Sequence, residues 1–224
     1  MWRLFQFPLC PFSRKVRLLL GEKGVGYELE PELPWERRDE FVDINPAGQT
    51  PVMIETQRDL RLIDSQAICE YFEETVAAAP MITGSAESRA EIRRLVAYFD
   101  QRLYAEAIAP LMRERMTRRL DRQSPDSGAL RDAMRQVGAH LDYIDYLLDH
   151  NRRWIAGPAL SLADLAAAAH ISVADYLGGC AWADHQSARD WYAGLKSRPS
   201  FRPLLAERMP MVPPYVAHYD KVDF

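Results

Sequence analysis

The chain changes its hydrophobic pattern once, near residue 80, and this change constrains the fold more than any other feature. Before it, short apolar stretches that suit strands alternate with stretches of helical spacing. After it, the apolar residues recur only with a period of about 3.6, which indicates amphipathic helices. The pattern predicts an α/β unit followed by an all-α unit.

The first eighty residues predict the element order β-α-β-(α)-β-β-α. The predicted strands lie at 4–7, 27–30, 51–54 and 60–63, with helices after Ser13, near 36–43 and after Ser65. Ser13 and Ser65 are each expected to cap the helix that follows, because a serine oxygen accepts from the free amides of a first helical turn.

The domain boundaries follow from the same pattern. We predict an α/β domain at 1-76, a linker at 77-86 that contains Pro80 and Gly84, an all-helical domain at 87-208, and an extended tail at 209-224. Pro110 falls inside the first long helical segment, where it is expected to kink the helix because proline lacks an amide donor.

Composition excludes several classes of protein. Hydrophobic residues make up 48% of the 224 residues and the net charge is −4, which favours a globular protein without general affinity for nucleic acid. Residues 1–12 lack the apolar core of a secretion signal, and stretch 165–183 is too polar for a membrane span, so we expect a cytoplasmic protein. The three cysteines have no paired spacing and no histidine has metal-ligand spacing, so we expect neither disulfides nor a metal.

Four local motifs punctuate these elements. They are Cys10-Pro11-Phe12-Ser13, the run 45–52 that ends in Thr50-Pro51-Val52, the pair Asp64-Ser65, and the helix start Ser161-x-x-Asp164. In this order and on these elements they resemble the glutathione transferase superfamily, over nearly the whole chain. The resemblance implies a thioredoxin-like N-terminal domain, a helical-bundle C-terminal domain, a cis peptide bond before Pro51, and a homodimer.

The first three motifs imply a pocket of the glutathione type. A thiol or hydroxyl at a helix N-terminus lies in positive potential, which stabilises its anion. A cis bond exposes the backbone of Thr50 for pairing with a peptide-like ligand, Ser65 can hold a carboxylate, and Asp64 can hold an ammonium group. If the protein is an enzyme, Cys10 and Ser13 are the catalytic candidates, with glutathione as the cofactor.

Two interpretations of the Cys10 turn stay open at this point. In the first, Cys10 forms mixed disulfides or Ser13 activates the glutathione thiol; a dithiol mechanism is excluded because position 13 is serine. In the second, Cys10 is a small buried turn residue and Ser13 is a plain helix cap. For Arg14 and Lys15 we favour solvated side chains.

The enzyme interpretation does not explain three features of the sequence. Each of them allows a packing role or a role in partner binding. The first is an arginine-rich helix end, with Arg113, Arg115, Arg118, Arg119 and Arg122. The second is the tail 209-224, with Tyr219, Asp220, Asp223 and Phe224, and the third is Trp35 in a loop. The arginines would suit an acidic partner. The tail is apolar enough to lie along the protein's own surface, with its last residues available for contact.

The tail and the segment Pro34-Trp35-Glu36-Arg37-Arg38 are similar to one branch of the superfamily, the FtsZ-binding cell-division proteins of alphaproteobacteria. This narrower resemblance implies a homodimer that binds FtsZ filaments, bends or bundles them and supports constriction at the division site, without a cofactor. The residues named above would then contact the filament or other division proteins. The enzyme interpretation, a glutathione transferase or monothiol reductase, remains the alternative, and a scaffold subunit of another assembly is a third.

Overall fold

The computed structural model describes residues 1–149 and 152–222. Its N-terminal part is built on one mixed sheet. The strands are β1 (Trp2–Gln6), β2 (Tyr27–Pro31), β3 (Val52–Glu55) and β4 (Leu60–Ile63), in the order β2-β1-β3-β4. The β1–β2 pair is parallel, whereas β1–β3 and β3–β4 are antiparallel. The alternation read from the sequence therefore locates the strands to within one or two residues.

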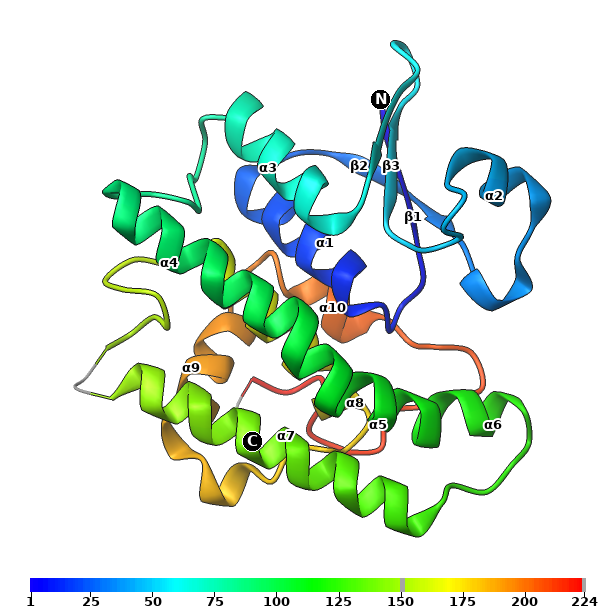
Figure 1. Cartoon of the computed structure of the whole chain (residues 1–224), viewed down its shortest axis with the longest axis vertical. Coiled ribbons are helices and arrows are strands. Elements are labelled where there is room, and N and C mark those ends of the chain that lie inside the picture. The colour runs from blue at the N-terminus through cyan, green and yellow to red at the C-terminus, as the bar shows by residue number, and fades with distance from the viewer. Residues whose placement is uncertain (150–151, 223–224) are drawn as a thin grey trace.

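Helices cover both faces of this sheet (Figure 1). Helices α1 (Pro11–Lys23) and α3 (Ser65–Thr75) lie on one face, and the 3₁₀ turn Pro34–Glu36 and α2 (Asp39–Ile44) lie on the other. The period of two along β1 explains the division: Leu4 joins the main core, while Phe5 packs against Phe41 of α2 with ring centroids 5.7 Å apart. The cis peptide bond expected at Thr50–Pro51 is present.

Between Ala86 and Ala206 the regular elements of the described chain are helices. Its α-helices are α4 (Ala86–Ala97), α5 (Ala109–Met112), α6 (Arg118–Leu120), α7 (Ser127–Leu148), α8 (Leu162–Tyr176), α9 (Gln186–Lys196) and α10 (Arg202–Ala206), with a 3₁₀ turn at Trp182–Asp184. α3 ends before the predicted linker and α4 begins at its last residue, Ala86. The domain boundaries themselves stay a prediction. π-helical segments Tyr98–Ile108 and Arg113–Thr117 flank α5, so the helix passes through Pro110 by wider winding at both sides.

Helix α8 is the centre of the molecule, and every one of its residues is buried. It packs against α1 of the N-terminal part and against α4 and the π-helical segment Tyr98–Ile108. The N-terminus of α1, which carries the Cys10 motif, is thereby fixed directly onto the helical part. No helix within the described ranges has the length and apolar character needed to cross a bilayer.

The tail runs over this helical core without regular secondary structure. Tyr176 of α8 donates its hydroxyl to the Val212 carbonyl at 2.6 Å, accepts from the Met209 amide at 3.1 Å, and accepts the Tyr215 amide at its own carbonyl at 2.8 Å. The tail from Met209 to Tyr219 therefore packs on the protein itself. The two last residues, Asp223 and Phe224, lie outside the described residues.

The start of α8 is held by one buried carboxylate. Asp164 accepts four hydrogen bonds of 2.9 to 3.0 Å, from the Ile155 amide, the Ser161 amide, the Ser161 hydroxyl and the Trp191 indole. Ser161 and Asp164 form the predicted capping box, and Asp164 also ties α9 and the preceding loop to it.

Replacing Asp164 by alanine should therefore destabilise the protein strongly, because four buried donors lose their acceptor. We expect a loss on the order of 4 kcal/mol in the free energy of unfolding, and a melting temperature lower by roughly 10 °C. Circular dichroism during heating measures both. Asp126→Ala is the matched control, since Asp126 caps α7 at the surface through one amide, at 2.8 Å from Ala129; equal losses in the two variants would contradict this account.

Candidate functional site

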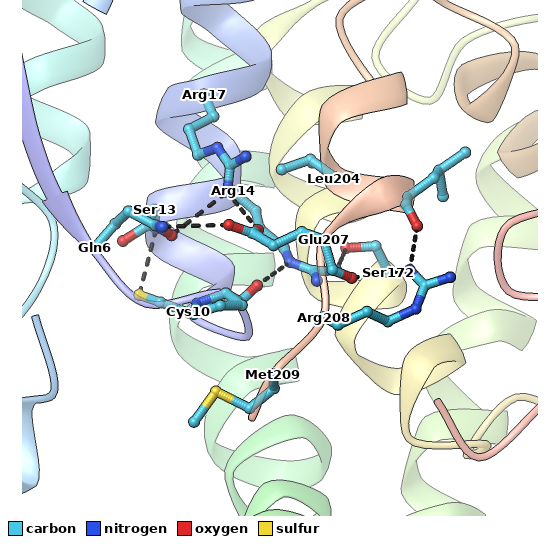
Figure 2. Close-up of polar contacts among 12 residues, drawn as sticks. Gln6, Cys10, Ser13, Arg14, Arg17, Ser172, Leu204, Glu207, Arg208 and Met209 are labelled. Atoms are coloured by element: carbon cyan, nitrogen blue, oxygen red, sulfur yellow. Dashed lines mark hydrogen bonds and ion pairs between the residues drawn. The ribbon is translucent and has the colours of Figure 1, made fainter. Parts of the chain in front are cut away.

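Cys10 is the N-cap residue of α1. Its sulfur accepts the Ser13 amide at 3.4 Å (Figure 2). The sulfur also lies 3.6 Å from the Thr50 carbonyl oxygen, and the residue is 3% exposed. The expectation that Ser13 caps this helix was wrong, because Pro11 takes the first helical position and moves the cap to Cys10. Ser13 is fully buried, and its hydroxyl has no hydrogen-bond partner in the part of the chain that the structure describes.

A cavity of about 400 Å³ opens beside the Cys10 turn. Its wall combines apolar side chains with a few polar groups: Phe7, Phe12, Trp35, Tyr104, Met112 and Met116 among the former, and Cys10, Gln49, Thr50, Arg113 and Thr117 among the latter. It lies between the N-terminal part and the helices after α4. Such a site can enclose an apolar group with a thiol close at hand.

Trp35 stands at the rim of this cavity. Its ring packs edge-on against Phe7 with centroids 5.2 Å apart, yet 46% of the residue is exposed. One edge of the ring is therefore packed and the remainder faces solvent, and the role of Trp35 in partner binding stays a prediction.

A second hollow, of about 380 Å³, contains the acidic pair. Asp64 and Ser65 line it together with Gln66, Arg93 and Asp100. Here too the predicted cap shifts by one residue: Asp64, at φ 80°, caps α3 by accepting the amides of Gln66 at 2.7 Å and Ala67 at 3.0 Å. Ser65, expected to be the cap, is the first residue of the helix and is 4% exposed.

Phe12 lines both hollows and lies between them. Its ring is wedged edge-on against Tyr104 at 4.8 Å and His170 at 5.3 Å, measured between centroids. The residues predicted to form one glutathione-type pocket are thus divided, with Cys10 and Thr50 on one side and Asp64 and Ser65 on the other. Pro51 lines neither of these two hollows.

Arg14 and Lys15 are buried, contrary to the expectation that they are solvated. Lys15 forms an ion pair with Asp100, whose other oxygen is 3.1 Å from His170 Nε2. Sequence reasoning missed this because Asp100 and His170 are distant in the chain and join Lys15 only when α8 packs on α1.

The arginine-rich helix end is partly committed to structure. The fully buried Glu114 carboxylate pairs with Arg113 at 3.2 Å and Arg118 at 2.7 Å and accepts the Asp126 amide at 2.8 Å. Arg115 donates to the Leu177 carbonyl and its guanidinium lies 4.8 Å from the Tyr215 ring centroid. Arg115 is therefore a packing residue, which makes it a poor choice for a surface substitution.

The structure joins the arginine-rich end to the tail. Arg119 donates to the Met211 carbonyl at 2.6 Å, and Met211 and Tyr215 are 62% and 40% exposed. We call this surface the basic-apolar face and define it by its residues: Arg113, Arg118, Arg119, Arg122, Met211 and Tyr215. Sequence reasoning treated the two segments as separate features.

The tail residues expected to bind a partner differ in exposure. Tyr219 is 1% exposed, so its side chain is inaccessible to a partner and its role in this structure is packing. Asp220 is exposed and pairs with Arg208 at 3.0 Å.

One cluster in the described chain has metal-type residues that sequence spacing did not reveal. Asp142, Asp145 and His185 place their ligand atoms within 4.8 Å of one another. Asp145, however, uses one oxygen on His185 Nδ1 at 3.0 Å and the other on the Ala188 amide at 2.7 Å. These bonds secure the start of α9 and explain the cluster without an ion.

Known proteins resemble this chain over its full length. Residues 4–80 match the glutathione S-transferase N-terminal domain family. The chain is 46% identical over 224 residues to FtsZ-localized protein A of Caulobacter vibrioides, a match that covers 99% of this chain and 97% of that protein.

Two solved structures share the whole fold. FzlA from C. crescentus has a TM-score of 0.96 at 46% identity, with 100% of this chain and 99% of that chain covered. A glutathione S-transferase from Rhodospirillum rubrum F11 has a TM-score of 0.95 at 45% identity, with both chains covered completely. The predicted fold, a thioredoxin-like domain with a helical-bundle domain, is confirmed.

The buried histidines predict a loss of stability in mild acid. Burial lowers the pKa of His170, with Asp100 opposing and Lys15 adding to the shift, and burial lowers the pKa of His140 against the opposing Glu106. Below a pH of about 6.5 the unfolded chain therefore binds more protons than the folded one.

We expect the free energy of unfolding to fall between pH 7.5 and pH 5.5, by at most about 1.4 kcal/mol per pH unit for each histidine. Urea unfolding at a series of pH values measures the slope. His170→Gln should reduce it, because glutamine keeps a donor but does not titrate. A slope unchanged by this variant, or stability that increases toward pH 5.5, would show the assignment to be wrong.

Proposed function

We propose a filament-binding role in cell division for this chain, which belongs to the family of FtsZ-localized protein A on the glutathione S-transferase fold. In this role the protein binds FtsZ filaments, bends or bundles them and supports constriction. It acts in the cytoplasm at the division site and uses no cofactor. The proposal is carried by the 46% identity to FtsZ-localized protein A across 99% of the chain, tail included.

The basic-apolar face supports the proposal with a surface of suitable chemistry. Segment 113–122 has five arginines against Glu114 and Asp121, which leaves three net positive charges on a chain of net charge −4. The exposed parts of Met211 and Tyr215 add apolar contact area next to these charges. An acidic protein surface with apolar groups fits this combination, since opposite charge steers association and apolar burial stabilises the complex.

Trp35 extends this surface to the cavity rim. It lines the same cavity as Arg113 and Thr117, so the rim connects the N-terminal part with the arginine-rich end. Large aromatic and arginine side chains are the residue types that contribute most to binding at protein interfaces. We therefore include Trp35 in the filament contact, and Asp220, Asp223 and Phe224 in contacts with filament or other division proteins.

We further propose that the protein acts as a homodimer, as the resemblance to transferases implies. A two-fold dimer would present two basic-apolar faces to a filament, and paired weak contacts raise the overall affinity. Sedimentation velocity should give a mass near twice the 25.7 kDa of one chain. A single species at the mass of one chain would dispose of this part of the proposal.

The enzyme alternative rests on a different observation, the position of Cys10 at the N-terminus of α1 beside a cavity of about 400 Å³. A glutathione transferase or monothiol reductase would use Cys10 or Ser13 there. Two features weigh against it. Phe12 separates Cys10 from the Asp64–Ser65 hollow, and the Ser13 hydroxyl is fully buried.

Arg119→Glu and Trp35→Ala should each reduce co-sedimentation with polymerised FtsZ, by roughly tenfold in affinity at low salt. Arg119 suits the test because its guanidinium donates to the Met211 carbonyl rather than to a buried carboxylate. Raising the salt concentration should weaken the pelleting of the unchanged protein, since exposed charges are screened.

Arg152→Glu is the matched control for charge. Arg152 is exposed and follows the C-terminal end of α7, whereas the arginine-rich end adjoins the N-terminal end of that helix through Glu114 and Asp126. Equal pelleting of the Arg119 and Arg152 variants would remove the basic-apolar face from the contact. Absence of pelleting by the unchanged protein at low salt would remove FtsZ binding altogether.

Calorimetric titration with glutathione separates the two functions. We expect the unchanged protein to bind more weakly than about 1 mM, and Phe12→Ala to bind more tightly because it joins the two hollows. Micromolar affinity in the unchanged protein, together with thiol-transfer activity lost in Cys10→Ala or Ser13→Ala, would favour the enzyme instead.

A further inference from the structure

Arg14 has a fully buried side chain and no carboxylate to pair with among the described residues. Its Nε donates to the Pro8 carbonyl at 2.7 Å, and its Nη1 donates to the Ser172 hydroxyl at 2.7 Å and to the Tyr219 hydroxyl at 2.9 Å. Within residues 1–149 and 152–222, its Nη2 has no hydrogen-bond partner. A guanidinium stays charged in proteins, so these few neutral acceptors are what makes its burial tolerable.

One of those acceptors belongs to the tail. Tyr219 donates its own hydroxyl to the Leu204 carbonyl at 3.2 Å and packs its ring on Tyr176 at 4.9 Å between centroids. The segment between α10 and the tail is also fastened to α1, because Glu207 accepts from Arg17 at 2.6 Å (Figure 2). The end of the chain is therefore held against the first turns of α1 at two points.

The opposite side of the same guanidinium holds the Cys10 turn. Pro8, whose carbonyl accepts from Arg14, lies two residues before Cys10, and the Cys10 amide donates to the Phe7 carbonyl at 3.0 Å. Figure 2 shows Arg14 between the Cys10 turn and Ser172. A single buried side chain thus contacts the tail at one end and the turn that carries the thiol at the other.

We propose that the tail is a strap that keeps the turn 8–10 closed through Arg14, so that lifting the tail exposes the Cys10 thiol. With the tail in place Arg14 donates to Pro8, Ser172 and Tyr219, and Cys10 is 3% exposed. When the tail leaves, Arg14 loses an acceptor and is opened to water, and the turn loses the fixed donor that holds Pro8. A partner that binds the last residues and lifts the tail would thereby expose the thiol beside the cavity. The inference does not depend on FtsZ being that partner.

The fold offers a second way to lift the strap, at a site remote from Arg14. The tail crosses Gly178, at φ 67°, where an added Cβ would come within 2.7 Å of Arg115 Nη1 and 3.1 Å of Tyr215 Cβ. Gly178→Ala should therefore push residues 215–216 away without altering Arg14, Tyr219 or Cys10. Gly24→Ala is its control, because Gly24 has φ 68° and nothing within 4 Å of the added Cβ.

The test is the rate at which iodoacetamide alkylates each cysteine of the full chain, followed by peptide mass spectrometry. Tyr219→Phe removes only the hydroxyl, which accepts from Arg14 and donates to the Leu204 carbonyl. It should raise the rate of Cys10 alkylation about tenfold, as expected for loss of a hydrogen bond to a charged group. Gly178→Ala should raise the Cys10 rate as well, and Gly24→Ala should not.

Cys69 is an internal control in every sample. It is fully buried in α3, and burial raises its pKa to about 12, so it reacts only when the N-terminal part unfolds. The proposal requires that Cys10 is alkylated faster in these variants while the alkylation rate of Cys69 is unchanged. The proposal would be overturned if the alkylation rate of Cys10 were unchanged in both Tyr219→Phe and Gly178→Ala. It would also be overturned if the rates of Cys10 and Cys69 rose in parallel.

Discussion

The packing of α1 on α8 is the contact on which the rest of the structure depends. It fixes the Cys10 turn to the helical part, encloses the cavity between the two parts and buries the cations Arg14 and Lys15. Each cation then contacts a segment distant in the sequence. Lys15 forms an ion pair with Asp100, and Arg14 donates a hydrogen bond to Tyr219 of the tail. One interface between two helices thereby positions the candidate site and the end of the chain together.

Two separate hollows contain the residues that were predicted to form one glutathione-type pocket. The Phe12 ring separates the thiol from the acidic pair, and the larger hollow has a wall rich in aromatic and methionine side chains. On the outside, the arginine-rich end and the tail form one surface because Arg119 is bonded to the tail backbone. A scaffold that serves catalysis elsewhere thus presents surfaces suited to binding a macromolecule, since function depends on the site and not on the fold.

The fold could be predicted from the sequence because its signals are local. Alternation at Leu4 and Phe5, the order of the four motifs and the Ser161–Asp164 capping box all lie within a few residues of the elements they define. The caps were misplaced by one to three residues, because Pro11 and Asp64 compete with nearby serines. The burial of Arg14 could not be predicted, since Ser172 and Tyr219 lie 158 and 205 residues away in the chain.

The central claim is that the basic-apolar face is the surface that meets the filament. Hydrogen exchange of the protein, free and bound to polymerised FtsZ, tests it most directly because it reports every segment at once. The account predicts slower exchange on binding at segments 113–122 and 211–215 and around Trp35, with exchange at 152–158 unchanged. Protection confined to other segments, with 113–122 and 211–215 exchanging as in the free protein, would contradict it.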